Sequence, residues 1–160
     1  MRYVRRNPQP LAALASALIA LLGAPAEADD KALFNGAWLL DESAAVSFVA
    51  CGDRLCGRIV WLKHAKAQGG ETACDTKNPD GMLVGRALCG MTVLSGLIAA
   101  DTGTWTNGRF YNPNDGETYD VFLNLVSSDE LSARIYIGSS IIGQTKTLRR
   151  VAHDSATGWC

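Results

Sequence analysis

Five cysteines carry the most distinctive side-chain chemistry of this sequence: Cys51, Cys56, Cys74, Cys89 and Cys160. Thiolates can bind zinc, exchange electrons as a dithiol, or pair as disulfides. The first four could in principle join His64 in a zinc site, but their spacings exceed the gaps of about two to four residues found in zinc ribbons. No C-x-x-C dithiol motif is present either. Which chemistry applies therefore depends on the compartment and on the fold.

Other catalytic groups are sparse. The sequence has two histidines, His64 in a long loop and His153 in the C-terminal tail. A Ser-His-Asp hydrolase needs a histidine beside its nucleophile, and no G-x-S-x-G motif supplies one. We interpret both histidines as solvated loop residues.

Loop carboxylates are the remaining candidates for acid–base catalysis: Asp75, Asp80, Asp115 and Glu117. Asp80 and Asp115 lie beside proline and glycine, which is typical of turns. In the segment D-T-K-N-P-D-G, which starts at Asp75, Lys77 stands where a calcium loop needs an oxygen ligand. We therefore expect no bound metal and no cofactor, and a hydrolase that uses these carboxylates is the least favoured hypothesis.

The first 28 residues have the organisation of an export signal. Three arginines precede an apolar run at residues 11–22, and the small residues A-P-A-E-A follow up to Ala28. As a helix this run would reach about 18 Å, short of the roughly 30 Å core of a bilayer. We expect a cleaved signal peptide (1–28), secretion by the general route to the periplasm or outside the cell, and no membrane span afterwards.

The net charge and the expected export limit the functions that the protein can have. The formal net charge is −1, which gives no basic surface for nucleic acid or anionic membranes. All five cysteines follow the expected cleavage site, and disulfides persist in oxidising compartments.

The rest of the chain shows short alternating runs bounded by turn residues, which indicates an all-β domain. Tyr119, Val121 and Leu123 share one face of such a run, opposite Asp120 and Asn124. Short connectors make sequential strands antiparallel, and a meander of about eight strands removes its edges by closing into a barrel. The predicted strands are 36–41, 45–50, 58–62, 91–99, 104–111, 118–126, 131–137 and 145–151.

We therefore expect one barrel domain at 29–152, with a long insertion at 63–90 and a flexible tail at 153–160. The hairpin between the second and third strands places Cys51 opposite Cys56, within reach of a disulfide worth about 2 kcal/mol. Pairing Cys74 with Cys89 would stabilise by about 3 kcal/mol and clamp the insertion. Cys160 would then stay unpaired and could cross-link two copies.

Four motifs in order resemble a known family. They are C-G-x-x-L-C-G-R-I-V-W-L from Cys51, D-x-K-N-P-D from Asp75, R-x-L-C-G from Arg86 and Y-N-P-x-D-G-x-x-Y from Tyr111. The sequence is similar to the bacterial domain-of-unknown-function 2147 family. The resemblance implies a secreted, small lipocalin-like barrel and no established activity.

Individual positions refine this resemblance. Gly36-Ala37-Trp38 resembles the lipocalin G-x-W signature, in which an arginine of the last strand lies across the tryptophan. Arg150 is the matching residue here, with Arg149 as the alternative, and the implied role of the pair is structural. Two departures from the family pattern, Ile135 for glycine and Leu148 for tryptophan, bear on the shape of a ligand site.

The favoured hypothesis is a non-enzymatic module that binds a small hydrophobic or amphiphilic molecule, since barrels of this size hold at most one small ligand. The alternative is an envelope interaction protein with a filled barrel that presents its insertion to a partner. We also expect at least one of Arg58, Arg109 and Arg134 to point inward as a polar anchor for a ligand. The candidate ligand-binding residues are Trp61, Trp105, Tyr119, Arg134 and Tyr136.

Overall fold

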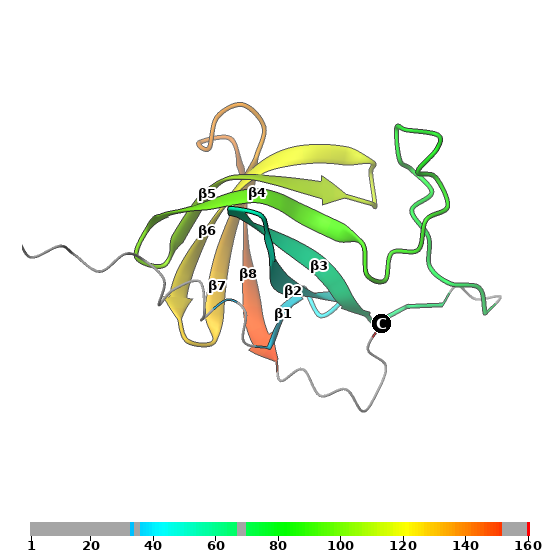
Figure 1. Ribbon diagram of the computed structural model, residues 1–160, viewed down its shortest axis with the longest axis horizontal. Helices are drawn as coiled ribbons and strands as arrows, with labels where there is room; N and C mark the ends of the chain where they lie inside the picture. Colours follow the sequence, from blue (N-terminus) through cyan, green and yellow to red (C-terminus); the bar gives the residue numbers. More distant parts are fainter. Residues whose placement is uncertain (1–32, 34–35, 67–69, 152–159) are drawn as a thin grey trace, which may run out of the picture.

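A computed structural model describes Leu33, residues 36–66, residues 70–151 and Cys160 (Figure 1). Within these residues eight strands follow one another along the chain. They are β1 (Ala37–Leu40), β2 (Ala44–Cys51), β3 (Arg54–Leu62), β4 (Thr92–Asp101), β5 (Thr104–Asn112), β6 (Glu117–Ser127), β7 (Glu130–Tyr136) and β8 (Gly143–Val151).

Each strand pairs antiparallel with the next, and β1 pairs with β8 to close the barrel. The predicted all-β meander, closed into a barrel, is confirmed. The largest difference in bounds is at β3, which begins at Arg54 because Cys56 and Gly57 already pair with Val49 and Phe48 of β2. In the described part of the chain, no helix is long and apolar enough to cross a bilayer.

One end of the barrel is filled by buried, mostly apolar side chains. Trp38 is fully buried, and its indole nitrogen donates a hydrogen bond to the carbonyl oxygen of Leu33 at 3.1 Å. The Arg150 guanidinium lies over the Trp38 ring at 4.3 Å, as the G-x-W resemblance implied. Leu148, the departure from the family pattern, joins this core. The core at the closed end includes Leu33, Trp38, Phe48, Leu97, Trp105, Leu123, Leu131 and Leu148.

The hairpin disulfide forms as predicted, between Cys51 and Cys56, with Cα atoms 5.9 Å apart. Its geometry differs from expectation because Cys51 is paired with Arg54, and Cys56 with Val49. The two cysteines are thus diagonal neighbours on one face of the ladder rather than directly opposite, a separation that side chains still bridge.

The predicted Cys74–Cys89 disulfide is wrong. Cys89 pairs with Cys160, 71 positions along the chain, and Cys74 is a free thiol. The backbone N–H of Cys160 also donates to the Val60 carbonyl at 2.7 Å, so the end of the chain lies beside β3 (Figure 1). Cys160 is therefore not available to cross-link two copies. The expected signal peptide and residues 153–159 of the expected tail lie outside the described residues.

Thiol labelling tests this pairing. Denatured protein that has not been reduced should take up one label per chain, and peptide mapping should place it on Cys74. Reduction before labelling should raise the count to all five cysteines. A label found on Cys160 with Cys74 protected would contradict the structure and restore the pairing expected from sequence.

Candidate functional site

The other end of the barrel, opposite Trp38, is hollow. Two adjoining open cavities lie there, a first lobe of about 500 Å³ and a second lobe of about 490 Å³. We call them together the mouth cavity. The first lobe reaches the 137–142 loop, and the second lies against the insertion and the β1–β2 turn. Residues that line both lobes are Phe110, Asn112, Ile135, Gln144 and Lys146.

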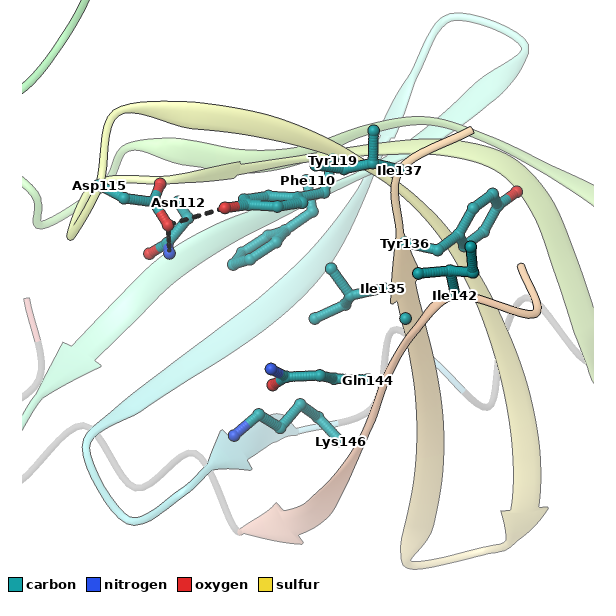
Figure 2. A pocket seen from close by; sticks show the side chains of 11 residues that line it. Phe110, Asn112, Asp115, Tyr119, Ile135, Tyr136, Ile137, Ile142, Gln144 and Lys146 are labelled. Atoms are coloured by element: carbon teal, nitrogen blue, oxygen red, sulfur yellow. Dashed lines mark hydrogen bonds between the residues drawn. The ribbon is translucent and has the colours of Figure 1, made fainter. Parts of the chain in front are cut away.

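Strand alternation places the polar wall of this cavity on β8. Arg150 faces Trp38, and Leu148 lies in the core. Side chains two apart share a face of a strand, so Lys146 and Gln144 also point into the barrel, nearer the mouth. Ile135 is paired with Gln144 across β7 and β8, and Figure 2 shows these three side chains pointing to the same side of their strands.

An aromatic pair forms the facing wall. Phe110 on β5 is paired with Tyr119 on β6, and their ring centroids are 6.4 Å apart. The Tyr119 hydroxyl donates to Asp115 Oδ2 at 2.9 Å, and the Asn112 amide donates to the same oxygen at 2.6 Å (Figure 2). The turn between β5 and β6 is thereby fixed against the cavity wall.

These contacts also set ionisation at the mouth. Burial acts to raise the pKa of Asp115, but hydrogen bonds from the Glu117 backbone N–H, Tyr119 and Asn112 outweigh it and lower that pKa. The hydrogen bond to Asp115 raises the pKa of Tyr119. Asp115 is therefore a carboxylate at neutral pH and Tyr119 a neutral phenol.

The 137–142 loop presents apolar side chains at the mouth. Ile137 and Ile142 line the first lobe, yet they are 69% and 76% exposed. Arg134 shapes this loop from the outer face of β7. Its guanidinium donates to the carbonyl oxygens of Ser140 at 2.9 Å and Ile141 at 3.0 Å. The result is water-exposed apolar surface beside the cavity, which a ligand could cover.

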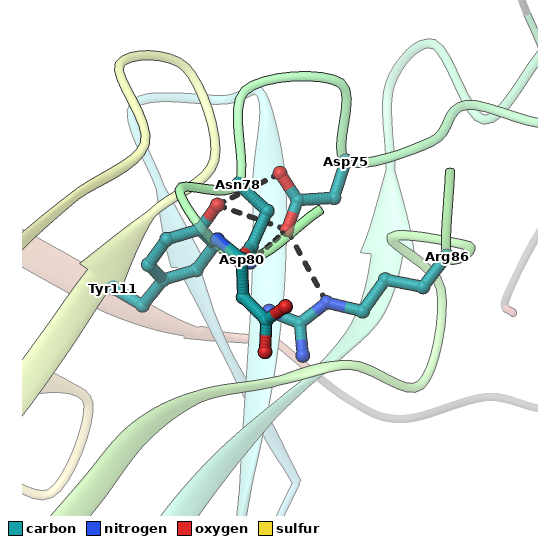
Figure 3. A network of polar contacts seen from close by, with 5 residues as sticks. All are labelled: Asp75, Asn78, Asp80, Arg86 and Tyr111. Atoms are coloured by element: carbon teal, nitrogen blue, oxygen red, sulfur yellow. Dashed lines mark hydrogen bonds and ion pairs between the residues drawn. The ribbon is translucent and has the colours of Figure 1, made fainter. Parts of the chain in front are cut away.

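A buried carboxylate holds the insertion against the barrel. Asp75 is completely buried, and it accepts hydrogen bonds from the Tyr111 hydroxyl at 2.8 Å, the Asn78 amide at 2.9 Å and Arg86 Nε at 3.2 Å (Figure 3). Burial raises the pKa of Asp75, but these three donors outweigh it and lower that pKa. The Arg86 guanidinium also lies 5.4 Å from the Tyr111 ring centroid.

This network matters for the cavity because the insertion supplies part of its wall. Leu88 and His64 line the second lobe together with Asn114 of the β5–β6 turn. Gly116 in that turn has a φ of +82°, and a Cβ there would overlap the carbonyl oxygen of Lys77 in the insertion. Glycine is required at this contact, where the two segments meet backbone to backbone.

The five predicted ligand-binding residues do not gather at a single site. Tyr119 and Tyr136 line the first lobe, Tyr136 from its outer rim. Trp105 is fully buried in the core, Trp61 lines neither lobe, and Arg134 shapes the loop from outside. Their role in binding stays a prediction, and the structure gathers two of the five at the cavity.

The expectation of an inward arginine among three candidates is wrong. Arg58 is exposed, Arg109 forms an ion pair with Asp120 on the outer face, and Arg134 is also outside. The inward cation near the mouth is Lys146. The sequence contained a signal for this orientation. Arg150 was expected to lie inward over Trp38, and residues two positions apart on a strand share a face, so Lys146 falls on the same inward face.

Features of metal and acid–base sites are sparse in the described residues. There, no group of three or more His, Cys, Asp or Glu side chains could hold a metal ion. Asp80 caps a turn, since its Oδ1 accepts the Met82 N–H at 3.0 Å. A general acid at neutral pH needs a raised pKa, whereas the pKa values of Asp75 and Asp115 are both lowered.

A family model described as "Uncharacterized protein conserved in bacteria (DUF2147)" matches residues 36–150. The chain belongs to the DUF2147 family. Among solved structures, this DUF2147 protein is similar to HP1028 from Helicobacter pylori, described as belonging to the lipocalin family. The TM-score is 0.67 and the identity 23%, over 76% of this chain and 85% of that one. No curated protein matches it.

The Asp75 network gives a test by pH. Asp75→Asn should destabilise the protein by about 2 kcal/mol at pH 7, since it weakens hydrogen bonds to a buried charge. The pKa of Asp75 is lower in the folded protein than the value of about 3.9 for an unfolded aspartate, so its ionised form stabilises the folded state above about pH 4. This stabilisation is lost as pH falls through the pKa that Asp75 has in the folded protein. The difference in unfolding free energy between wild type and Asp75→Asn should therefore shrink below about pH 4, as measured by urea unfolding.

Asp80→Asn is the matched control, because Asp80 is exposed and an asparagine oxygen can still accept the turn hydrogen bond. It should change stability little at any pH. A difference for Asp75→Asn that stays constant from neutral to acidic pH would contradict the role given to the carboxylate charge.

Proposed function

We propose that this DUF2147 protein is a non-enzymatic binding protein that holds a small hydrophobic or amphiphilic molecule in its mouth cavity. The single observation that carries the proposal is the mouth cavity, the open space at the end of the barrel opposite Trp38. Each lobe is about 500 or 490 Å³, within the roughly 300–1,000 Å³ typical of ligand pockets. Apolar side chains predominate in the walls, and polar ones such as Asn112, Gln144 and Lys146 lie among them, as in ligand sites.

The filled-barrel alternative fits only the closed end. Around Trp38 the interior is packed, whereas Ile135 near the mouth is partly buried and adjoins both lobes. A barrel that served only to present its insertion would gain stability by filling this space. The exposed Ile137 and Ile142 beside the cavity favour an apolar ligand in the same way.

We also propose that the protein is exported, as its N-terminal sequence predicts. Two disulfides, Cys51–Cys56 and Cys89–Cys160, support this because such bonds persist in oxidising compartments. Fractionation of cells that express the full chain should recover the protein outside the cytoplasm with an N-terminus at Asp29. Recovery of the intact chain from the cytoplasm would count against export.

Ligand binding can be tested with N-phenyl-1-naphthylamine, an uncharged dye whose fluorescence rises in apolar sites. The wild-type protein should give saturable fluorescence. Ile135→Trp fills the junction of the two lobes and should weaken binding by about tenfold, a cost of roughly 1.4 kcal/mol. Ile135→Ala enlarges the same space and should keep binding.

Thr147→Trp provides the matched control, since Thr147 is exposed on the outer face of β8. It should bind the dye as the wild type does. Equal affinity for wild type, Ile135→Trp and Thr147→Trp would show that the dye binds elsewhere, and no saturable binding to the wild type would overturn the proposal. Native mass spectrometry of the purified protein would identify any molecule that co-purifies.

A further inference from the structure

Lys146 occupies the junction of the two lobes. It lines both of them, and no other lysine or arginine of the described residues lines either. Its neighbours in the shared wall include Phe110 and Ile135, both apolar. A single lysine among apolar and neutral polar side chains inside a cavity can orient a ligand of opposite charge.

Lys146 already holds one carboxylate, that of Asp41. Lys146 Nζ donates to Asp41 Oδ2 at 2.7 Å, and the two side chains are 37% and 55% exposed. Exposed ion pairs of this kind contribute little to stability. Asp41 lies in the β1–β2 turn at the edge of the second lobe, so its carboxylate can move into water while Lys146 takes another anion.

Other parts of the cavity also suit an anionic head group at Lys146. Gln144 lies two residues before Lys146 on the same inward face and lines both lobes, so its side-chain amide can donate to a head group. The second lobe, which Lys146 lines, is also lined by the apolar side chains of Leu62 and Val93. By contrast, the Asp115 carboxylate lies in the first lobe and opposes a second negative charge.

We propose that the ligand is a single-chain amphiphile with a monoanionic head group, a carboxylate in the simplest case. The head group displaces Asp41 from Lys146, and the apolar tail lies along the second lobe. One cation, balanced by one carboxylate in the unliganded protein, matches one negative charge on the ligand. This inference rests on the proposed function and narrows it to a class of ligand.

The test compares a fluorescent acid with its neutral ester. Dansyl-aminoundecanoic acid should bind the wild type more tightly than its methyl ester. Lys146→Gln should weaken binding of the acid by about tenfold, the value of one hydrogen bond to a charged group, and should leave the ester unchanged. Asp41→Asn removes the competing carboxylate and should tighten binding of the acid alone.

Two further variants serve as controls. Lys146→Arg keeps the charge and should retain the preference for the acid. Lys66→Gln makes the same charge change at an exposed position that lines neither lobe, and it should alter neither affinity. Circular dichroism should show that each variant is folded.

The outcomes separate this inference from the proposed function. If acid and ester bind the wild type equally, or if Lys146→Gln weakens both alike, the anionic head group is overturned while binding in the cavity stands. If neither probe binds, both proposals fail. A loss of acid binding in Lys66→Gln equal to that in Lys146→Gln would mean that overall charge, not the site, selects the acid.

Discussion

Pairing of β1 with β8 is the constraint on which the rest of the molecule depends. It turns a meander into a closed barrel, so every strand has one face toward a shared interior and no edge is left open. Trp38 on β1 and Arg150 on β8 are paired in this register and lie one over the other. The same register that buries Trp38 also directs Lys146 inward at the other end.

The two ends of the interior serve different purposes. Large apolar side chains are buried together at the closed end, and this packing stabilises the fold. At the mouth, Ile135, Gln144 and Lys146 point inward and line open space (Figure 2). A protein that keeps a cavity forgoes the stability that filling it would bring, and the mouth cavity lies at the end that carries the insertion and the 137–142 loop.

The insertion shows how a segment without regular strands becomes part of a binding wall. Burial of the Asp75 charge is unfavourable by itself, but Tyr111, Asn78 and Arg86 supply donors to it. Tyr111 comes from β5, so the network joins the insertion to the barrel. The Cys89–Cys160 disulfide ties the base of the same insertion to the end of the chain, and together these contacts hold Leu88 at the second lobe.

By itself, the sequence determined the strand order and the antiparallel closure, because two-residue periodicity and short connectors are local properties. The Trp38–Arg150 contact was implied by the resemblance of Gly36-Ala37-Trp38 to the lipocalin signature, which left Arg149 as the alternative. The sequence also indicated the hairpin disulfide, whose cysteines are five positions apart. Tertiary structure alone decided that Cys89 bonds to Cys160 and not to Cys74, that Arg134 faces outward, and that Lys146 meets Asp41 in a cavity. These outcomes depend on which distant segments pack together and on how completely side chains fill the interior, and neither is a property of any short stretch of chain.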